Sequence, residues 1–584
     1  MRTLVVLLIL SILLFCLPRS VTDSSDVKAS VGNPVHNLDT GINYTSIQDA
    51  INANETLTGH TIFVENGTYL EHVSVNKSIS LIGESRQSTV VDASHVGHVF
   101  DVTSENVSIS NFRVQNAGNT SLTDCAVVAN KSAHCTVSNL TIQNCYSGIL
   151  ILESNGSSVS DTVILGTLFG MYIHNSSSSV VVRNDLTGCA GGGISIQVST
   201  KCFVRDNNMT NCYTAFAAGG DLLEHFLNDI DTSNTIDGKP IYYLMNQTDI
   251  TINPSTFPEI GSLTVVNSTR VTIENLTFNK GGPHLFSAFS SNSTIRNVTA
   301  SNSTSGIGLI SVTDTVVTEN NVSDCFFSIY LTQSHNNTLM NNTISNSGLA
   351  AIALRYSTEN LVFGNNATND ERCIDLMESE NNTIRHNNFV NYSEAYTDGH
   401  PNVWDDGLEG NYWSSYAGVD LNNDGIGDTP HTLDVGNEDN HPLMGMFHAY
   451  IVSSYTQPNL IVNLVSNSSV SSLEVFFVLE HPEITSIQFY VSGESGLGFC
   501  RICIPHNLIN APYQIYIDEA QPLYANHSIH DNGTHTWIYF TYEHTEQHSV
   551  IITIPEFSKF TVLLMVLIVP LIAVAYNRKK RFKK

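Results

Sequence analysis

The chain has 584 residues, a formal net charge of −29 and only 14% charged residues, against roughly a quarter in average soluble proteins. Eight of the 25 basic residues lie in the first 19 and the last seven positions, so the body between them carries 17 basic against 54 acidic residues, a net charge of −37. Surfaces that bind phosphate backbones are basic, so this charge argues against nucleic acid as a partner. Asn is unusually frequent, at about one residue in ten.

Residues 1–22 have the composition of a secretory signal peptide. Arg2 precedes a nearly unbroken apolar run from Leu4 to Leu17, which is the order of a charged n-region and an apolar h-region. No clear small-x-small cleavage site follows, so the segment is either cleaved near Ser20 or kept as an uncleaved anchor. We therefore expect the rest of the chain to be extracellular.

A short amphipathic helix is expected to begin after Ser46. Ser46 is a favoured N-cap residue, Asp49 follows three positions later, and Ile47 and Ile51 recur at helical spacing. Such a helix would cover the open end of a stack of strands, where an exposed edge invites aggregation.

From about residue 40 to residue 400 the sequence repeats every 22 to 23 residues, with three apolar positions per repeat. The first column holds Val137, Val159, Val181 and Val204, then Ile295, Val317, Leu339, Val362 and Ile384. The second column, five residues later, holds Ile142, Ile164, Leu186 and Met209, then Ala300, Val322, Ile344, Ala367 and Phe389. The third column holds Ile149, Met171, Ile194 and Phe216, then Ile307, Ile329, Ile352 and Ile374.

The repeat predicts an all-β parallel β-helix. Its apolar segments are short, β-branched and alternating, which indicates strands rather than helices. Three strands per repeat make one coil, and neighbouring coils stack about 4.8 Å apart. Asn adopts the left-handed conformation at corners and forms amide ladders along a stack, while stacked like charges repel each other. The Asn excess and the low charge therefore have one explanation.

The period breaks between Asp221 and Pro258, and residues 233–243 are expected to leave the coil as a longer excursion. Acidic residues are dense here, beside His225. Sugar-cleaving β-helix enzymes place two or three carboxylates on one groove, so these acids are either a site or solvated loop residues. We favour loop residues, because no lyase or esterase motif accompanies them; the acids are Asp221, Glu224, Asp229, Asp231 and Asp237.

Residues 401–447 form an end segment rich in Trp and Gly, with a loop of calcium-binding type. Oxygen ligands are spaced as in the first nine positions of an EF-hand loop, and a Gly stands at the tight turn. The predicted Ca²⁺ ligands are Asp420, Asn422, Asp424, the carbonyl of Ile426, and Asp428. The twelfth position is His431 rather than Glu, so a further ligand would come from Asp434, Glu438 or Asp439. The expected role is structural, and the alternative is a plain Asp/Asn/Gly turn.

Three aromatic residues accompany this loop. Trp404, Tyr412 and Trp413 are expected to pack where the coil ends. The alternative is that their rings stack on sugar.

Several of these segments resemble the NosD-type right-handed parallel β-helix family. The resemblance covers roughly residues 43–446: the opening from Thr45 to Gly83, the Asn-rich coils, the excursion, and an ending made of Trp404, Gly410–Trp413, Asp420–Pro430 and Pro442–Met444. It implies a right-handed coil. The family's namesake is a periplasmic protein linked to copper delivery, and many relatives are surface proteins.

Copper is not expected as a cofactor of this chain. Periplasmic copper carriers use clustered soft or imidazole ligands, whereas the 22 His residues here are scattered. The best local set is Met444, Met446 and His448, which we interpret as a strand that leaves the β-helix.

Residues 448–554 are expected to form a small immunoglobulin-like β-sandwich that acts as a stalk. Alternating apolar segments recur at sandwich-like spacing, as in Leu473–Val478, Ile487–Val491 and Thr536–Thr541.

Residues 555–584 resemble the PEF-type sorting signal of archaeal surface proteins. Pro555-Glu556-Phe557 precedes an apolar run from Phe560 to Tyr576 and a basic tail. The order fits a membrane helix with a cytoplasmic tail. The segment is either an ordinary membrane anchor or a signal that an archaeosortase removes.

About 26 Asn-x-Ser/Thr sequons support an extracellular glycoprotein. We therefore predict a membrane-tethered surface protein that binds surface glycans or neighbouring surface proteins without catalysis. The alternatives are a carbohydrate-active enzyme, as a polysaccharide lyase or hydrolase, and a NosD-like periplasmic copper-binding protein.

Overall fold

The computed structural model describes residues 33–553, except 121–123, 281, 283, 455–457, 479–480, 511, 519–527 and 545–546. Its contacts define two units. Of the described residues, unit 1 holds those up to Thr383 together with Asn391–Asn402, and unit 2 holds Ile384–Val390 and those from Val403 onward. The predicted signal peptide (1–22) and the sorting signal or anchor (555–584) lie outside the described residues.

No membrane-spanning candidate occurs in the part of the chain that the structure describes, because none of its helices is both long and apolar enough.

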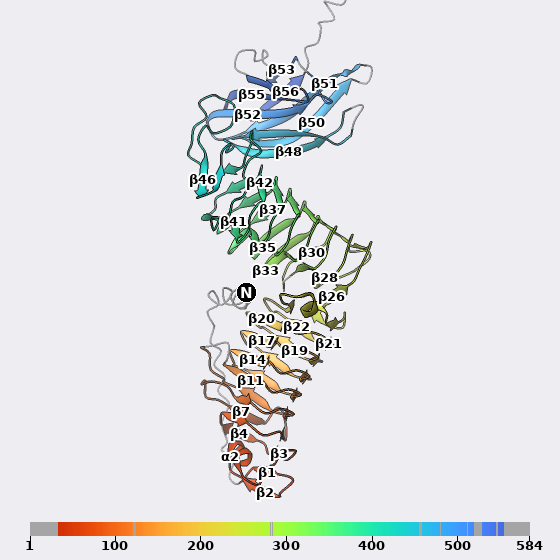
Figure 1. Cartoon of the computed structure of the whole chain (residues 1–584), viewed down its shortest axis with the longest axis vertical. Coiled ribbons are helices and arrows are strands. Elements are labelled where there is room, and N and C mark those ends of the chain that lie inside the picture. Colours follow the sequence, from red (N-terminus) through yellow and green to blue (C-terminus); the bar gives the residue numbers. More distant parts are fainter. Residues whose placement is uncertain are drawn as a thin grey trace, which may run out of the picture. The chain divides into compact units, whose positions relative to one another are not determined.

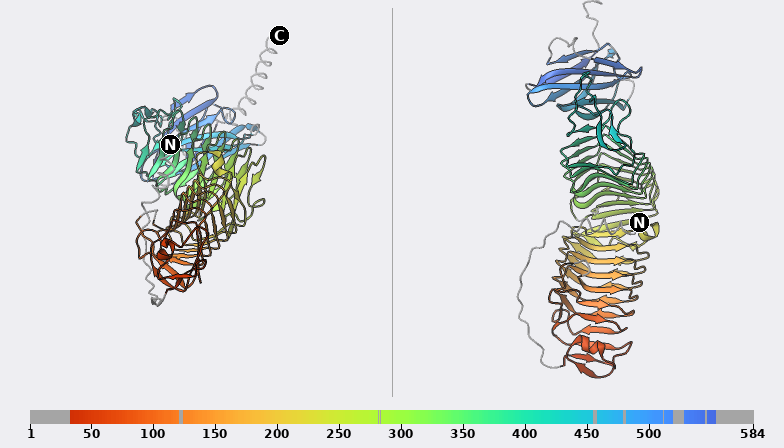
Figure 2. Two further views of the ribbon diagram at one scale, coloured as in Figure 1. Left: turned by 60° about the horizontal axis from the view of Figure 1, so that its bottom comes forward. Right: turned by 60° about the vertical axis from the view of Figure 1, so that its left-hand side comes forward.

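Unit 1 is a parallel β-solenoid with three strands per coil. Figure 1 and the right-hand view of Figure 2 show the red-to-yellow strands stacked on one another. The first strands of the early coils are β3 (Thr61–Val64), β6 (Ser80–Gly83), β9 (Ser108–Ser110), β12 (Thr136–Ser138), β15 (Ser158–Ser160), β18 (Val180–Val182), β21 (Phe203–Arg205) and β24 (Asp229–Ile230). The second strands are β4 (Gly67–Leu70), β7 (Thr89–Asp92), β10 (Arg113–Gln115), β13 (Thr141–Gln143), β16 (Val163–Leu165), β19 (Asp185–Thr187), β22 (Asn208–Thr210) and β25 (Thr235–Ile236). The third strands are β5 (Val73–Val75), β8 (Phe100–Val102), β11 (Cys125–Asn130), β14 (Ser147–Leu152), β17 (Phe169–His174), β20 (Gly192–Gln197) and β23 (Phe216–Gly219).

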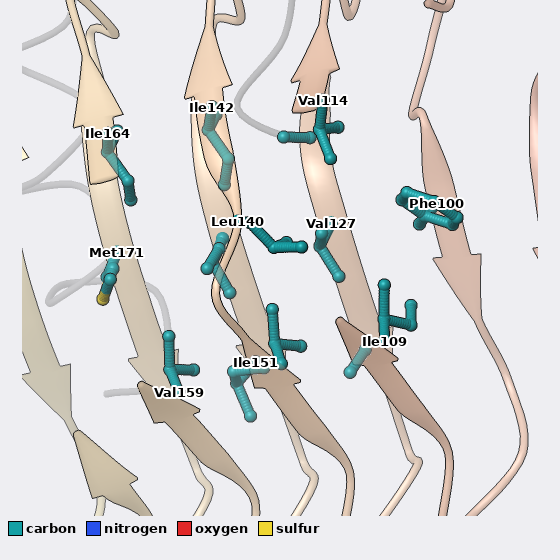
Figure 3. Close-up of a cluster of buried hydrophobic side chains, with 14 of the residues drawn as sticks. Phe100, Ile109, Val114, Val127, Leu140, Ile142, Ile151, Val159, Ile164 and Met171 are labelled. Carbon is teal, nitrogen blue, oxygen red and sulfur yellow. The ribbon is translucent and has the colours of Figure 1, made fainter. Parts of the chain in front are cut away.

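The apolar columns are confirmed as the core of the solenoid. Val137 pairs with Val159, Ile142 with Ile164 and Ile149 with Met171 in parallel, in-register ladders. In Figure 3 the labelled side chains of successive coils point into one shared interior. Burying each aliphatic side chain contributes roughly 1.5–3 kcal/mol, so every coil adds a similar increment to the stack.

The first coil is covered by a short cap. β1 (Val35–Asn37) and β2 (Ile42–Tyr44) form an antiparallel pair, and α2 (Ile47–Asn52) follows. Ser46 is the N-cap residue, because its Oγ accepts from the backbone N–H of Asp49 at 3.0 Å. Ile47, Ala50 and Ile51 are the buried face of the helix.

The excursion is a 3-10 turn followed by a hairpin. The turn η2 (Leu223–Phe226) precedes β24, and β25 pairs antiparallel with β26 (Lys239–Met245). Asp237 and Gly238 join them with φ of +48° and +79°, as a two-residue hairpin turn requires. β26 then pairs in parallel with the next coil, so stacking resumes.

The later coils repeat the same pattern. Their first strands are β27 (Thr251–Ile252), β29 (Thr272–Glu274), β32 (Thr294–Arg296), β34 (Val316–Thr318), β36 (Thr338–Met340), β39 (Leu361–Phe363) and β42 (Thr383–Arg385). Their second and third strands are β28 (Ser262–Val266), β30 (Thr277–Phe278), β31 (Leu285–Ala288), β33 (Thr299–Ile310), β35 (Asn321–Thr332), β37 (Thr343–Ser345), β38 (Ala350–Arg355), β40 (Asn366–Thr368), β41 (Arg372–Met377) and β44 (Glu394–Tyr396). β33 and β35 each run through a corner and supply both strands of a coil.

Asparagine has two separate roles in the solenoid. Many corner residues, such as Asn297 and Asn341, have φ near +50°, which Asn tolerates better than other residues. A different set is fully buried and forms amide ladders: Asn207 Nδ2 donates to Asn234 Oδ1 at 2.8 Å and to the Val181 carbonyl at 2.8 Å. Asn297 also donates its side-chain amide to the corner asparagine of the preceding coil, so corner asparagines form ladders as expected, and the buried ladders are an additional feature.

Unit 2 contains several short strands and two larger antiparallel sheets. The short strands are β43 (Asn388–Val390), β45 (Tyr412–Trp413), β46 (His431–Asp434) and β47 (Asn437–Asp439). One sheet has the order β48 (Met446–Val452), β49 (Leu460–Ser466), β52 (Gly496–Pro505), β55 (His535–His544) and β54 (Ser528–Asp531). The other has the order β50 (Ser469–Val478), β51 (His481–Ser492), β56 (His548–Thr553) and β53 (Gln514–Ile517), and residues of both sheets share one buried core.

Candidate functional site

Unit 1 has a cleft of about 260 Å³ beside the excursion. One side is made by residues of β17, β20 and β23, and the other by residues of β28, β31, β33, β35 and β38. The Thr214 hydroxyl donates to the Thr304 hydroxyl at 3.1 Å and so connects the two sides. The cleft therefore joins coils that precede the excursion to coils that follow it.

Aromatic rings dominate the lining. Phe169, Tyr172, Phe286 and Tyr356 are half-buried, so part of each ring stays accessible. Phe216, Phe327 and Tyr330 also line the cleft and are buried. The Phe286 and Tyr330 rings meet edge to face with centroids 5.7 Å apart, an arrangement that aromatic pairs prefer. Burial raises the pKa of Tyr330, so its hydroxyl stays protonated at neutral pH.

Strand alternation explains why these rings face outward. Tyr172 stands in register with Ser195 and Ala217, and Phe286 with Gly308 and Tyr330. These rows alternate with the buried columns, so they point away from the core. Gly308 leaves room for a ring, because a Cβ at this position would lie 2.7 Å from the Tyr330 ring.

Polar groups complete the lining. Arg355 lies over the Phe327 ring at 5.1 Å, and its Nη2 donates to Oδ2 of the fully buried Asp375 at 3.2 Å. Ser195, Gln197, Thr332 and Gln333 add hydroxyl and amide groups. Among the described residues that line the cleft, Asp221 is the sole carboxylate.

Three of the remaining acids of the excursion make contacts outside the cleft lining. Arg205 pairs with Asp229 and Asp231 at 2.5 and 2.8 Å, and Asp237 accepts from the backbone N–H of Asn211 at 2.8 Å. Of the five acids, Asp221 alone is among the described residues that line the cleft.

The predicted calcium ligands lie in one tight loop of unit 2. Asp420 accepts from the backbone N–H groups of Asp424 and Gly425 at 3.1 and 2.8 Å, and Asp424 accepts from that of Ile426 at 2.9 Å. Asp428 closes the loop by accepting from the Leu421 N–H. Within the described ranges, no group of three or more His, Cys, Asp or Glu side chains is arranged to hold a metal ion.

Two of the later candidate ligands are committed to other contacts. Asp439 accepts from Trp413 Nε1 at 2.8 Å and from the Asn411 N–H at 2.7 Å. Asp434 accepts from the Asn437 amide at 2.8 Å. Burial raises the pKa of Asp439 to about 6.

Two of the three aromatic residues considered for sugar stacking in the end segment are buried. Trp404 and Trp413 are each 1% exposed and pack together with ring centroids 5.7 Å apart. Their indole N–H groups donate to Asn437 and Asp439 at 3.0 and 2.8 Å. Tyr412 is half-buried. The two indoles are therefore structural, because burial removes the ring faces that a sugar would contact.

Sequence reasoning missed the cleft and a buried polar cluster around Glu409. The cleft aromatics are visible in the sequence as outward positions of third strands, but the sequence does not tell which coils meet across the excursion. The cluster includes Arg501 and Trp537, which lie 92 and 128 residues from Glu409, a separation that no local pattern reveals.

Comparisons with known proteins agree with the fold. The family model described as "Periplasmic copper-binding protein (NosD)" matches residues 226–418, and the model described as "Right handed beta helix region" matches residues 97–257. A relative named "Cell surface glycoprotein", from Methanothermus fervidus, is 25% identical; the match covers 34% of this chain and 43% of the relative's length.

Solved structures with similarity include the A-module of a mannuronan C-5 epimerase from Azotobacter vinelandii, with 13% identity, a TM-score of 0.24, and coverage of 61% of this chain and 92% of that one. The catalytic unit of a GH87 α-1,3-glucanase from Streptomyces thermodiastaticus has 16% identity, a TM-score of 0.27, and coverage of 62% and 61%. The match of the NosD model to residues 226–418 and that of the right-handed β-helix model to residues 97–257 confirm the resemblance of this chain to the NosD-type right-handed parallel β-helix family.

Proposed function

We propose that this chain is an extracellular surface protein whose solenoid cleft binds a carbohydrate chain without catalysing a reaction on it. The observation that carries this proposal is the lining: seven aromatic rings together with hydroxyl and amide groups, and one carboxylate among the described lining residues. The C–H face of a pyranose packs on an aromatic ring, and its hydroxyls pair with Ser, Thr and Gln side chains.

The surface location has independent support. The relative from Methanothermus fervidus is named a cell surface glycoprotein. The chain covers 43% of that relative's length, so the surface location of the relative is only proposed for this chain. The apolar run from Phe560 to Tyr576 and the basic tail are proposed to tether the protein to the membrane.

We prefer binding without catalysis to the enzymatic alternative because the described cleft lining has a single carboxylate. Glycoside hydrolysis uses a pair of carboxylates separated by about 5–9.5 Å. Asp221 has no second carboxylate among the described lining residues, and Asp375 is paired with Arg355 and fully buried.

Copper binding, the printed description of one matching family, is the second alternative. His448 is the imidazole of the best sequence cluster, and burial lowers its pKa. A Cu(I) titration of the full chain that gives stoichiometric binding would replace our proposal.

A carbohydrate-binding screen tests the proposal. The full chain, the Tyr172→Ala and Phe286→Ala variants, and a Phe203→Ala control are applied to arrayed glycans. Phe203 is an exposed ring over Arg205 and does not line the cleft. Losing one ring contact of about 0.5–1.5 kcal/mol weakens binding roughly 2- to 12-fold. Equal binding by the cleft variants and the unchanged chain rejects the cleft as the site, and shortened glycan products would favour the enzyme.

A further inference from the structure

Neighbouring asparagines in unit 1 divide into an inward and an outward member. In six Asn-Asn pairs one side chain is buried and the other is half-buried or exposed. The buried members are Asn207, Asn320, Asn337, Asn342, Asn365 and Asn382. The outward members are Asn208, Asn321, Asn336, Asn341, Asn366 and Asn381.

The inward members hold the coils together. Asn320 Nδ2 donates to the Ile295 carbonyl at 3.1 Å and to Asn342 Oδ1 at 2.9 Å. Asn342 continues the ladder to the Val317 carbonyl and to Asn365, both at 2.9 Å. These amides have no accessible nitrogen and cannot accept a substituent in the folded chain.

The outward members coincide with the sequons. In all six pairs the outward Asn begins an Asn-x-Ser/Thr triplet and the inward Asn does not. The same division holds for the whole described chain, where every sequon Asn is half-buried or exposed and every buried Asn lies outside a sequon.

Strand alternation provides the mechanism of this division. The residue two positions after an inward Asn points into the core, as Ile344 does after Asn342. The residue two positions after an outward Asn points to solvent, as Ser323 does after Asn321. Both groups that an N-glycosylation acceptor requires, the Asn amide and the hydroxyl two residues later, are therefore accessible together.

We propose that these outward asparagines are acceptor sites for N-linked oligosaccharides. In the transfer, Asn Nδ2 forms a bond to C1 of the first sugar of a lipid-phosphate-linked oligosaccharide. The bond from C1 to the phosphate oxygen breaks, the phosphate keeps the electron pair, and the amide loses one proton. Nothing is oxidised or reduced.

The corner ladders survive this modification. Asn297 Nδ2 donates to Asn275 Oδ1 at 2.5 Å, and both residues begin sequons. An unmodified amide has two N–H groups, and a glycosylated one keeps one, so the ladder bond and the glycan coexist on one residue.

The proposed glycans leave the cleft open. No cleft-lining residue among those described is an asparagine. The sequon of Asn302 stands at its border, because Thr304 lines the cleft. This proposal does not depend on carbohydrate binding by the cleft, and it holds if the cleft binds another ligand.

Glycopeptide mass spectrometry of the full chain, purified from the cells that naturally make it, tests the proposal. We expect oligosaccharide mass additions on the outward members, including Asn321 and Asn341. Asn321→Gln should remove one glycan from the intact mass and leave the melting temperature unchanged. The matched Asn320→Gln variant should keep the glycan and lower the melting temperature. Thr343→Ala should abolish modification at Asn341 with the asparagine itself intact. Recovered peptides that show these outward asparagines unmodified in the natural protein overturn the proposal, whatever the variants do.

Discussion

Arg501 donates from Nε to Glu409 Oε1 at 2.8 Å, and the two side chains are 10% and 7% exposed. Arg501 belongs to β52, whereas Glu409 precedes β45 in the end segment. Trp537 Nε1 and His386 Nε2 contact the same carboxylate at 3.1 and 3.0 Å. One buried carboxylate thus joins three separate stretches of unit 2. Burial alone would raise the pKa of Glu409, but the hydrogen bond from His386 and the charge of Arg501 lower it to about 2.

Replacing Glu409 by Gln should destabilise unit 2 by about 3–5 kcal/mol, because it leaves the buried Arg501 cation without its partner. All three Trp residues of the chain, Trp404, Trp413 and Trp537, lie in unit 2. Tryptophan fluorescence during urea unfolding therefore reports this unit alone. The exposed Glu543 on β55 provides the control, since Glu543→Gln should change the unfolding midpoint little. Equal midpoints for both variants would show that the cluster contributes no stability.

The same carboxylate predicts an acid-sensitive unit 2. The pKa of Glu409 falls from its usual 4.5 to about 2 on folding. A depressed pKa gives stability that is fully present above pH 4.5 and is lost as the pH falls through 2. Asp439 acts in the opposite direction, because its raised pKa of about 6 costs stability as the pH rises above 3.8. Fluorescence-detected unfolding between pH 2 and pH 6 should show an acid limb that Glu409→Gln flattens, and an unchanged limb contradicts the assignment.

The amide ladder of unit 1 should be sensitive at single positions. Asn207 accepts from Asn184 Nδ2 at 2.9 Å and donates to Asn234 Oδ1 at 2.8 Å. Asn207→Ala leaves several buried polar groups unpaired, at about 1–3 kcal/mol for each unsatisfied group. Circular dichroism melting of unglycosylated protein should show a clear loss for this variant and a small one for its half-buried neighbour, Asn208→Ala. Similar losses for the two variants would mean that the buried amide ladder contributes no more stability than an exposed asparagine does.

Gly308 should be required for the aromatic packing of the cleft. A Cβ at this position lies 2.7 Å from the Tyr330 ring, so Gly308→Ala forces the ring to move, at about 1–3 kcal/mol. Gly348 is the matched control, because its nearest atom, on Phe326, lies 3.4 Å from a built Cβ. Thermal melting measures the expected loss of stability, and glycan binding measures the expected loss of affinity at the cleft. Full stability and binding in Gly308→Ala contradict this packing.

Calcium binding by the Asp420–Asp428 loop remains a prediction. Sites of this kind in extracellular modules have dissociation constants of about 10⁻⁴–10⁻³ M, and ligand at 100 times the dissociation constant adds about 2.7 kcal/mol. Millimolar to tens of millimolar Ca²⁺ should therefore raise the fluorescence-detected melting temperature of unit 2, whereas Asp424→Asn should abolish the increase. Magnesium is the ion control. An identical melting temperature in Ca²⁺ and in a chelator rejects the site.

The coil itself was predictable from the sequence, since each coil repeats the same three columns. Val137, Val159 and Val181 mark the core because parallel in-register stacking forces like residues onto one line. The cleft was not predictable, because Tyr172 and Phe286 belong to coils on either side of the hairpin and their proximity depends on the path of the excursion. The burial of Trp404 and Trp413 was also not predictable from composition alone, because an aromatic cluster has the same sequence pattern whether its rings bind a ligand or fill a core.

The in-register ladders also determine how such a chain can change in length. Removing or adding one full period of 22 or 23 residues at a corner keeps every apolar column in phase, and Ile295 would simply meet Leu339 where it now meets Val317. Corner loops absorb other length differences, since Ile109 pairs in register with Val137, which lies more than one 22- or 23-residue period away; an odd indel inside a strand, by contrast, exchanges inward for outward faces. Homologues whose stack is longer or shorter should therefore differ by whole coils, and each added coil lengthens the stack by about 4.8 Å.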